Sequence, residues 1–261
     1  MSIIIRDMIK DDEYYVGTCT HVNENNLERE MSCPRRISWL RSMEKDGLRV
    51  KVALIDGNHA GFIYVMPIEI NPWNIQGKDL MVFPCLVSHS KFTKIGIGKE
   101  LIKAAEEETK RLDRKGIATF GYFWDFWFMP AQYFVKLGFK VAEKRGEGAI
   151  LWKQFDLNAE APTFRKENYN FNPIKGKVVI DLFWNKFCLT SDIEAERVRE
   201  IALEYGKRVV LNEFSAVDQK ILQKYGIERR IYVNGDPMEI GSEVEKSKLR
   251  EAIDNALISI N

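Results

Sequence analysis

Apolar and polar positions alternate, or recur at helical spacing, in short segments over the first 155 residues. Apolar residues three and four apart predict an amphipathic helix over 35–45 that ends at Gly47. Two alternating segments, 49–55 and 60–65, flank Asp56-Gly57-Asn58 and predict a β-hairpin. The chain therefore starts as a domain that contains both helices and antiparallel strands.

The rest of this region has the order strand, loop, helix, strand, followed by a helix and two strands. The helix after the loop has one apolar face and one Glu/Lys-rich face, as a helix packed on a sheet does. The predicted elements are a strand at 80–88, a glycine-bearing loop at 94–98, a helix at 99–114, a strand at 117–124, a helix at 130–138 and strands at 139–143 and 149–153.

Periodicity disappears between residues 157 and 177, where Asn, Pro, Lys and Gly predominate, so this segment is predicted to be a connector. A second pattern follows, in the order βαβαββα, which predicts a small α/β domain with helices on both faces of its sheet. The predicted organisation is an N-terminal domain at 1–156, a connector at 157–177 and a C-terminal domain at 178–261.

Composition narrows the class of protein. Apolar residues make up 45% of the chain and charged residues 30%, as in globular proteins. The net charge of +1 gives no electrostatic case for binding nucleic acid or an anionic membrane. No apolar run approaches the ~20 residues of a spanning helix, and no signal peptide is visible, so we expect a cytoplasmic protein. The four scattered cysteines and three histidines lack the spacing of a disulfide framework or a metal site.

The loop after the 80–88 strand has the chemistry of an anion site. Backbone N–H groups at a helix start and the positive end of the helix dipole attract phosphate, and glycines let it approach closely. Lys94 and Lys99 flank the loop and can neutralise phosphate charge. The residues of this candidate anion site are Thr93, Lys94, Ile95, Gly96, Ile97, Gly98 and Lys99.

This loop resembles motif A of the GNAT superfamily of N-acetyltransferases, which has Arg or Gln, two residues, Gly, one residue, then Gly or Ala. Thr93 stands at the Arg/Gln position, and Gly96 and Gly98 at the small positions. Further along, Phe134-Val-Lys-Leu-Gly-Phe139 is similar to the closing Tyr-x-Lys-x-Gly-Phe signature of the superfamily. The resemblance covers about 150 residues and includes the order of elements.

The resemblance implies a mixed sheet with flanking helices, in which two neighbouring strands splay apart. Acetyl-coenzyme A would lie in the splay as co-substrate, its pantetheine paired with Leu86-Val87-Ser88 and its pyrophosphate on the loop from Thr93 to Lys99. Phe134 would lie near the coenzyme sulfur. A small-molecule or protein amine, entering from the other side, would attack the thioester directly. The sequence leaves the identity of the acceptor and the oligomeric state open.

The match departs from the superfamily where proton transfer is concerned. Phe134 occupies the place of the usual Tyr, which commonly serves as general acid. Tyr133 is adjacent but points about 100° around the helix. Trp127 replaces a frequent Asn, and Thr93 replaces a longer Arg or Gln. These departures leave open the alternative that the protein binds or senses acyl-coenzyme A without catalysing transfer.

Several residues are candidates for proton transfer or acceptor binding. His89 and Asp125 follow strands and, together with Tyr133, are the catalytic candidates, with Glu69 as a further carboxylate. Cys85 is interpreted as a packing residue. The aromatic run 122–129 would either line an acceptor pocket or be covered by the second domain.

The C-terminal region contains a segment similar to the first strand and active turn of thioredoxin. Apolar residues from Val178 lead to Phe183-Trp184 and then to Cys188-Leu-Thr-Ser191, a Cys-x-x-Ser in place of Cys-x-x-Cys. The resolving cysteine is missing, and the stretch 227–231 lacks the proline that faces it in thioredoxins. The combination resembles YoaP-like acetyltransferases and predicts an accessory domain in which Cys188 and Ser191 cap a helix. A thiol-redox protein that uses Cys188 is the alternative.

Overall fold

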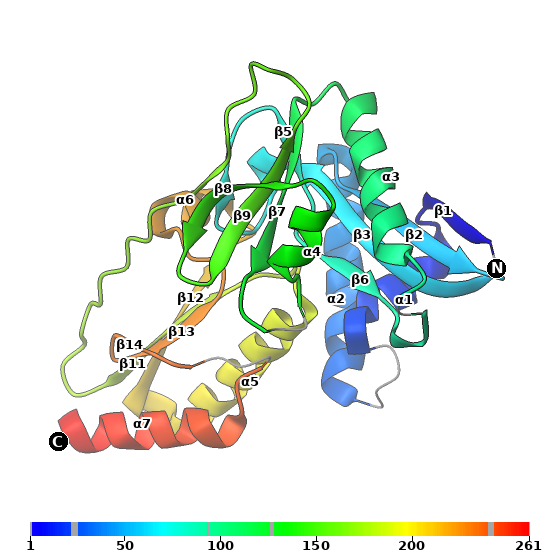
Figure 1. Ribbon diagram of the computed structural model, residues 1–261. Coiled ribbons are helices and arrows are strands. Elements are labelled where there is room, and N and C mark those ends of the chain that lie inside the picture. Colours follow the sequence, from blue (N-terminus) through cyan, green and yellow to red (C-terminus); the bar gives the residue numbers. More distant parts are fainter. Residues whose placement is uncertain (1, 22–25, 93, 126–127, 240–242, 261) are drawn as a thin grey trace. The chain divides into compact units, whose positions relative to one another are not determined.

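The computed structural model describes residues 2–21, 26–92, 94–125, 128–239 and 243–260. The chain forms two compact units, which are drawn as one ribbon in Figure 1. Unit 1 comprises Met1–Asn25, Leu40–Asn71 and Ile75–Arg165. Unit 2 comprises Asn26–Trp39, Pro72–Asn74 and Lys166–Asn261.

A mixed sheet forms the centre of unit 1, as the sequence predicted. Neighbouring strands are antiparallel except for β5 and β7, which are parallel. A further strand, β6 (Leu86–Ser88), pairs with β3 alone. The strand order is β1 (Ile3–Asp7), β2 (Arg49–Ile55), β3 (Asn58–Pro67), β5 (Leu80–Val82), β7 (Gly116–Tyr122), β9 (Gly148–Gln154) and β8 (Lys140–Arg145).

Alternate residues of β3 divide the core of unit 1 between the two faces of the sheet. Ile63 and Val65 belong to the apolar cluster under α3 (Ile97–Arg111) and α4 (Ala131–Lys136). Phe62 and Tyr64 contact α1 (Glu13–Thr18) instead, because the Phe62 ring packs edge-on against Tyr15 and the Tyr64 hydroxyl donates to a carbonyl of that helix. Helices therefore cover both faces of the sheet.

The predicted hairpin is confirmed. Asp56 and Gly57 connect β2 to β3 with φ of 48° and 80°, and positive φ at both central residues is typical of the type I′ turn that suits twisted strands. The predicted strand 80–88 differs, because it is broken into β5 and β6 at Phe83-Pro84-Cys85. Pro84 has no N–H to give to a ladder, and an apolar run does not reveal such a break.

Unit 2 has a four-stranded sheet in the order β12 (Val209–Ser215), β11 (Val178–Trp184), β13 (Arg230–Val233) and β14 (Asp236–Pro237). Central strand β11 is buried along its whole length and runs parallel to β12 and antiparallel to β13. One face packs against α5 (Leu189–Tyr205) and α7 (Lys246–Ile260), and the other packs against α6 (Gln219–Tyr225) and Tyr169. The predicted βαβαββα order is confirmed.

Two segments differ from their predictions in extent or order. Helix α2 (Leu27–Met43) begins well before the predicted helix 35–45 and has Pro34 inside it. The segment 157–177, predicted to be a connector, contains one two-residue strand, β10 (Thr163–Phe164), which pairs with β4 (Ile75–Gln76). Among the residues that the structure describes, no helix is both long and apolar enough to cross a membrane.

Candidate functional site

The sheet of unit 1 opens between β6 and β7. Strand β5 pairs with β7 as far as Val82, and the last bond runs from Phe83 N to Ala118 O (3.0 Å). Beyond Pro84 the chain turns away, so that β6 stays with β3 while β7 continues with β9. The edge of β6 on the β7 side has no strand partner within the described residues.

The register of β6 decides which backbone groups face this edge. Phe62 stands opposite Val87, and His89 N donates to Ala60 O at 2.8 Å. In an antiparallel pair, alternate residues direct their backbone groups to the partner strand. The N–H and C=O of Leu86 and Ser88 therefore point to the open edge, where an extended ligand with amide groups can bind them.

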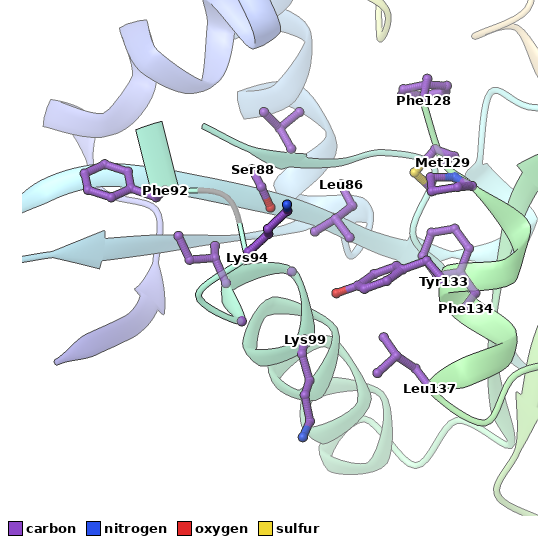
Figure 2. A pocket seen from close by; sticks show the side chains of 15 residues that line it. Leu86, Ser88, Phe92, Lys94, Lys99, Phe128, Met129, Tyr133, Phe134 and Leu137 are labelled. Atoms are coloured by element: carbon purple, nitrogen blue, oxygen red, sulfur yellow. The ribbon is translucent and has the colours of Figure 1, made fainter. Parts of the chain in front are cut away.

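The first turn of α3 lies beside this edge. Gly96 is the N-cap residue with φ of 92°, and no side chain there accepts the N–H groups of the first turn. A side chain added at Gly96 would meet no atom within 4 Å, so the loop borders open space. Lys94, also at positive φ (66°), points into the same space, as Figure 2 shows. The N–H groups of a helix's first turn and the positive end of its dipole attract anions, so this turn has the chemistry that a phosphate requires.

A cavity of about 540 Å³ joins the open edge, the α3 turn and α4 (Figure 2). Its wall is polar near the loop and apolar or aromatic towards α4, which suits a ligand with a charged end and an uncharged end. It is lined by Leu86, Val87, Ser88, Phe92, Lys94, Gly96, Ile97, Gly98, Lys99, Phe128, Met129, Pro130, Tyr133, Phe134 and Leu137.

Helix α4 brings two neighbouring aromatic residues to the cavity in different ways. Phe134 is only 1% exposed and packs its ring against Phe83 and Phe139, so it belongs mainly to the core. The Tyr133 hydroxyl crosses to α3, where it would lie 2.7 Å from a Cβ added at Gly98. Burial raises the pKa of Tyr133, so its hydroxyl keeps its proton at neutral pH.

Most of the predicted coenzyme-binding residues line this one cavity. Ile95 does not, and its side chain is 41% exposed. Thr93 and Trp127 lie outside the described residues. Tyr133, expected to point away from Phe134, lines the cavity together with it.

The other candidates for proton transfer lie elsewhere. The His89 ring accepts a hydrogen bond from Lys91 N and does not line the cavity. Asp125 is exposed and is also absent from the lining. Glu69 is paired with Arg114 at 3.2 Å. Among the described lining residues the titratable side chains are two lysines and one tyrosine, with neither carboxylate nor imidazole.

Sequence reasoning missed three lining residues, namely Phe92, Pro130 and Leu137, whereas Phe128 and Met129 belong to the aromatic run that it named as one wall of a possible acceptor pocket. A signal for two of them was present. Pro130, Tyr133, Phe134 and Leu137 have the spacing i, i+3, i+4, i+7, which places them on one face of a helix. The described residues contain no group of three or more His, Cys, Asp or Glu side chains that could hold a metal ion.

The cysteine turn of unit 2 is held together by its own polar groups. Cys188 is the N-cap residue of α5, but its thiol accepts no capping hydrogen bond and lies 3.0 Å from Thr190 Oγ1. Cys188 N donates to Asn185 Oδ1 at 2.9 Å, and Asn185 N donates to the Ser191 hydroxyl at 3.1 Å. The side chains of Asn185 and Ser191, rather than the thiol, fix the turn.

Comparisons with known proteins gave matches among solved structures only, because no family model and no curated protein matches the chain. The PaiA N-acetyltransferase of Thermoplasma acidophilum, in complex with coenzyme A, is 21% identical over 59% of this chain and 99% of its own, with a TM-score of 0.44. The ribosomal-protein-alanine N-acetyltransferase of Brucella melitensis is 18% identical over 58% and 99%, with a TM-score of 0.45. The GNAT family N-acetyltransferase YhbS of Escherichia coli, in complex with coenzyme A, is 14% identical over 59% and 81%, with a TM-score of 0.42.

Proposed function

We propose that unit 1 is an acetyl-coenzyme A-dependent N-acetyltransferase of the GNAT type. The observation that carries the proposal is the open edge of β6 beside the first turn of α3. Leu86 and Ser88 offer backbone groups to an extended chain of amides, and the turn from Lys94 to Lys99 offers N–H groups and two cations to a pyrophosphate. In coenzyme A, the extended pantetheine chain, which contains two amides, is joined to a pyrophosphate, so one molecule can bind both the strand edge and the turn.

The cavity also fits the reactive end of such a ligand. Beyond β6, the wall made by Met129, Phe134 and Leu86 is apolar, which suits an acetyl thioester and excludes water. The amine nitrogen forms a bond to the thioester carbon, and the carbon–sulfur bond breaks. The electrons of that bond leave with the sulfur as a thiolate, and the nitrogen gives up a proton. Placement of amine and thioester within about 3–3.5 Å supplies much of the rate.

Tyr133 is the residue we propose for proton donation to the leaving sulfur. Its hydroxyl reaches the cavity, which is the ground for the proposal. Burial raises its pKa, so the hydroxyl is protonated at neutral pH and does not act as a base. Phe134 provides ring packing without a proton. Because no carboxylate or imidazole is among the described lining residues, the amine proton leaves through water, with exposed Asp125 as a proposed acceptor.

The test is binding followed by turnover. Acetyl-coenzyme A at ~100 times its Kd stabilises a protein that binds it only when folded by about 2.7 kcal/mol, which melting experiments detect. Gly96→Glu places a carboxylate where the pyrophosphate would sit and should abolish the shift. Gly57→Glu is the matched control, because Gly57 also has positive φ (80°) and nothing within 4 Å of an added Cβ. A missing shift in the wild type at millimolar ligand would refute the proposal.

A non-catalytic acyl-coenzyme A sensor is the second candidate, and Phe134 at the usual tyrosine position favours it. Release of free coenzyme A, measured across a panel of small-molecule amines and peptide amino termini, separates the two. Tight binding without release on any acceptor would favour the sensor.

We further infer that unit 2 is a thioredoxin-like domain. The support is its strand order β12-β11-β13-β14 with one parallel pair, together with a cysteine at the start of the helix that follows β11.

A further inference from the structure

The first half of helix α2 is part of unit 2. Asn26 caps this half, since its side-chain oxygen accepts from Glu28 N at 2.8 Å. Pro34 lies inside the helix, where it lacks an N–H and crowds the carbonyl of residue 30, at a cost of ~3 kcal/mol. A short helix with an internal proline has little stability of its own, so this half depends on what it packs against.

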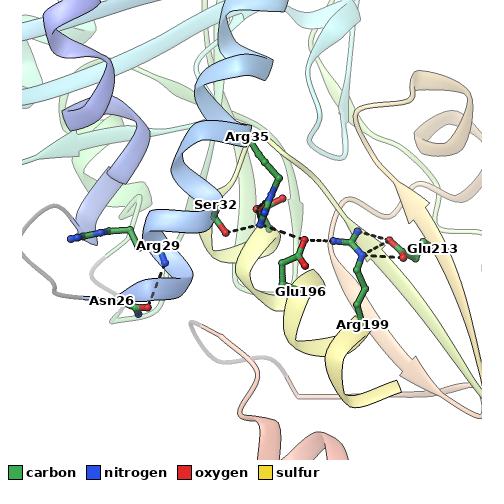
Figure 3. Close-up of polar contacts among 8 residues, drawn as sticks. Asn26, Arg29, Ser32, Arg35, Glu196, Arg199 and Glu213 are labelled. Carbon is green, nitrogen blue, oxygen red and sulfur yellow. Dashed lines mark hydrogen bonds and ion pairs between the residues drawn. The ribbon is translucent and has the colours of Figure 1, made fainter. Parts of the chain in front are cut away.

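Charged contacts attach this half of α2 to α5 (Figure 3). Arg35 donates to Asp192 Oδ2 from two nitrogens, at 2.6 and 2.9 Å, and reaches Glu196 at 3.4 Å. Arg197 of α5 donates from Nε to Glu28 at 2.9 Å. Asp192 is 1% exposed, so it would be a buried charge without its guanidinium partner.

Aromatic contacts extend this attachment to the cysteine turn. Phe187, which directly precedes Cys188, is 1% exposed. The Trp39 ring lies edge-on to it with centroids 5.7 Å apart, and the Arg36 guanidinium lies 5.7 Å from its ring centre. Residues of α2 thus cover the turn on its Phe187 side.

The cysteines of unit 2 are poorly placed for thiol chemistry. Cys188 is followed by Ser191 rather than by a second cysteine, and the Ser191 hydroxyl already accepts from Asn185 N. Cys33 of α2 is 2% exposed, and burial raises the pKa of its thiol, so it stays protonated and unreactive.

We propose that the face of α5 formed by Asp192, Glu196 and Arg197, continued by Phe187, is a docking surface for residues 26–39 of the same chain. Holding this basic and aromatic helix segment, rather than thiol–disulfide exchange, is what the C-terminal unit contributes. The proposal goes beyond the acyltransferase function and does not depend on it, because docking is measured without any substrate.

Hydrogen–deuterium exchange on the full-length protein tests the docking. Arg35→Glu places a carboxylate against Asp192 and should speed exchange of the backbone amides of residues 29–39 at least tenfold. Arg41→Glu is the matched control, because Arg41 lies on the same helix and also forms an ion pair, with Glu13 of unit 1. It should leave exchange in 29–39 within twofold of wild type. Wild-type exchange in Arg35→Glu would overturn the proposal.

Two further variants keep the test decisive if Arg35→Glu fails to fold. Arg35→Lys keeps the positive charge but loses the pair of hydrogen bonds from two guanidinium nitrogens to Asp192. Glu28→Gln removes the negative charge that pairs with Arg197. Each variant should speed exchange of the amides of residues 29–39 by a few-fold. Unchanged exchange in both would overturn docking by these pairs.

The thiol alternative has its own readout. Folded protein incubated with glutathione disulfide should show no adduct on Cys188 by intact mass, with Cys188→Ser as the reference. Rapid, stoichiometric modification of Cys188 would overturn the assignment of docking as the role of the unit.

Discussion

Substitution of Gly61 by Ala should displace β6 and so disturb the candidate coenzyme site. Gly61 lies on β3 opposite Ser88, at ordinary φ, so alanine is acceptable to the backbone and its effect is steric. A Cβ there would lie 2.5 Å from Val87 O and 3.0 Å from Ile97 Cγ2. Ordinary contacts begin at 3.4 Å, so β6 must move by about 0.9 Å, the difference between 3.4 and 2.5 Å.

The expected effect of Gly61→Ala has two parts, a loss of stability and a loss of turnover. Overpacking of a dense core costs about 1–3 kcal/mol of unfolding free energy, and the upper half applies because the nearest atom is backbone rather than a flexible side chain. A displacement near 1 Å in a strand that positions the substrate lowers turnover by ~10²-fold. Both parts follow from one movement, because β6 carries the open edge that we assign to pantetheine.

Urea unfolding of unliganded protein measures the stability, coenzyme A release measures the turnover, and acetyl-coenzyme A titration by calorimetry measures the Kd. We expect a loss of 2–3 kcal/mol in stability and at least a tenfold weaker Kd. Ala60→Gly is the control, because it removes a methyl group from the neighbouring position of β3 and so does not displace β6. A stability loss under 0.5 kcal/mol, or an unchanged Kd at reduced stability, would refute the assignment of the β6 edge to the coenzyme.

Three other variants test separate parts of the description. Tyr133→Phe should lower turnover 10- to 100-fold and leave the Kd of acetyl-coenzyme A within threefold; unaltered turnover across pH 6–9 would exclude it as the proton donor. The hydrogen bond from Arg111, with that from Lys51, lowers the pKa of Glu108 from 4.5 to about 2. The stabilisation that the ionised Glu108 carboxylate gives the folded state is therefore present above pH 4.5 and is lost as pH falls towards 2. After allowing for the exposure of Arg111, this stabilisation amounts to about 2 kcal/mol. Urea unfolding of Glu108→Gln should accordingly show less acid dependence than wild type. Cys188→Ser should change turnover less than threefold and stability by at most about 1 kcal/mol; a hundredfold loss at unchanged melting temperature would contradict an accessory role.

The loop and helix from Lys94 to Arg111 were predictable because two local signals agreed there. Glycines at the loop and an apolar face on the helix need no knowledge of distant residues. The break at Pro84 also had a local signal, since proline cannot donate to a ladder, but only the pairing of β5 and β6 with β3 at separate places shows how the strand divides.

Helix α2 shows a different limit. Its first half buries Arg29, Ser32 and Arg36 beside Cys33 and Trp39, so the face that packs is partly polar, and apolar periodicity reveals only part of it. Likewise, the sequence places Tyr133 and Phe134 next to each other without showing which one enters the core. That choice depends on Phe83 and Phe139, which are distant or on another element.

The Arg35–Asp192 bond also bears on how the chain folds during synthesis. The two residues are 157 positions apart, so at 5–20 residues per second the ribosome needs roughly 10–30 s to deliver the second after the first. Throughout that interval the segment 26–39, with its proline and its charges, has no docking surface to bind. The N-terminal half of α2 is therefore made well before the residues of α5 that it packs against. A ribosome stalled before α5 would leave this segment accessible to proteases and chaperones.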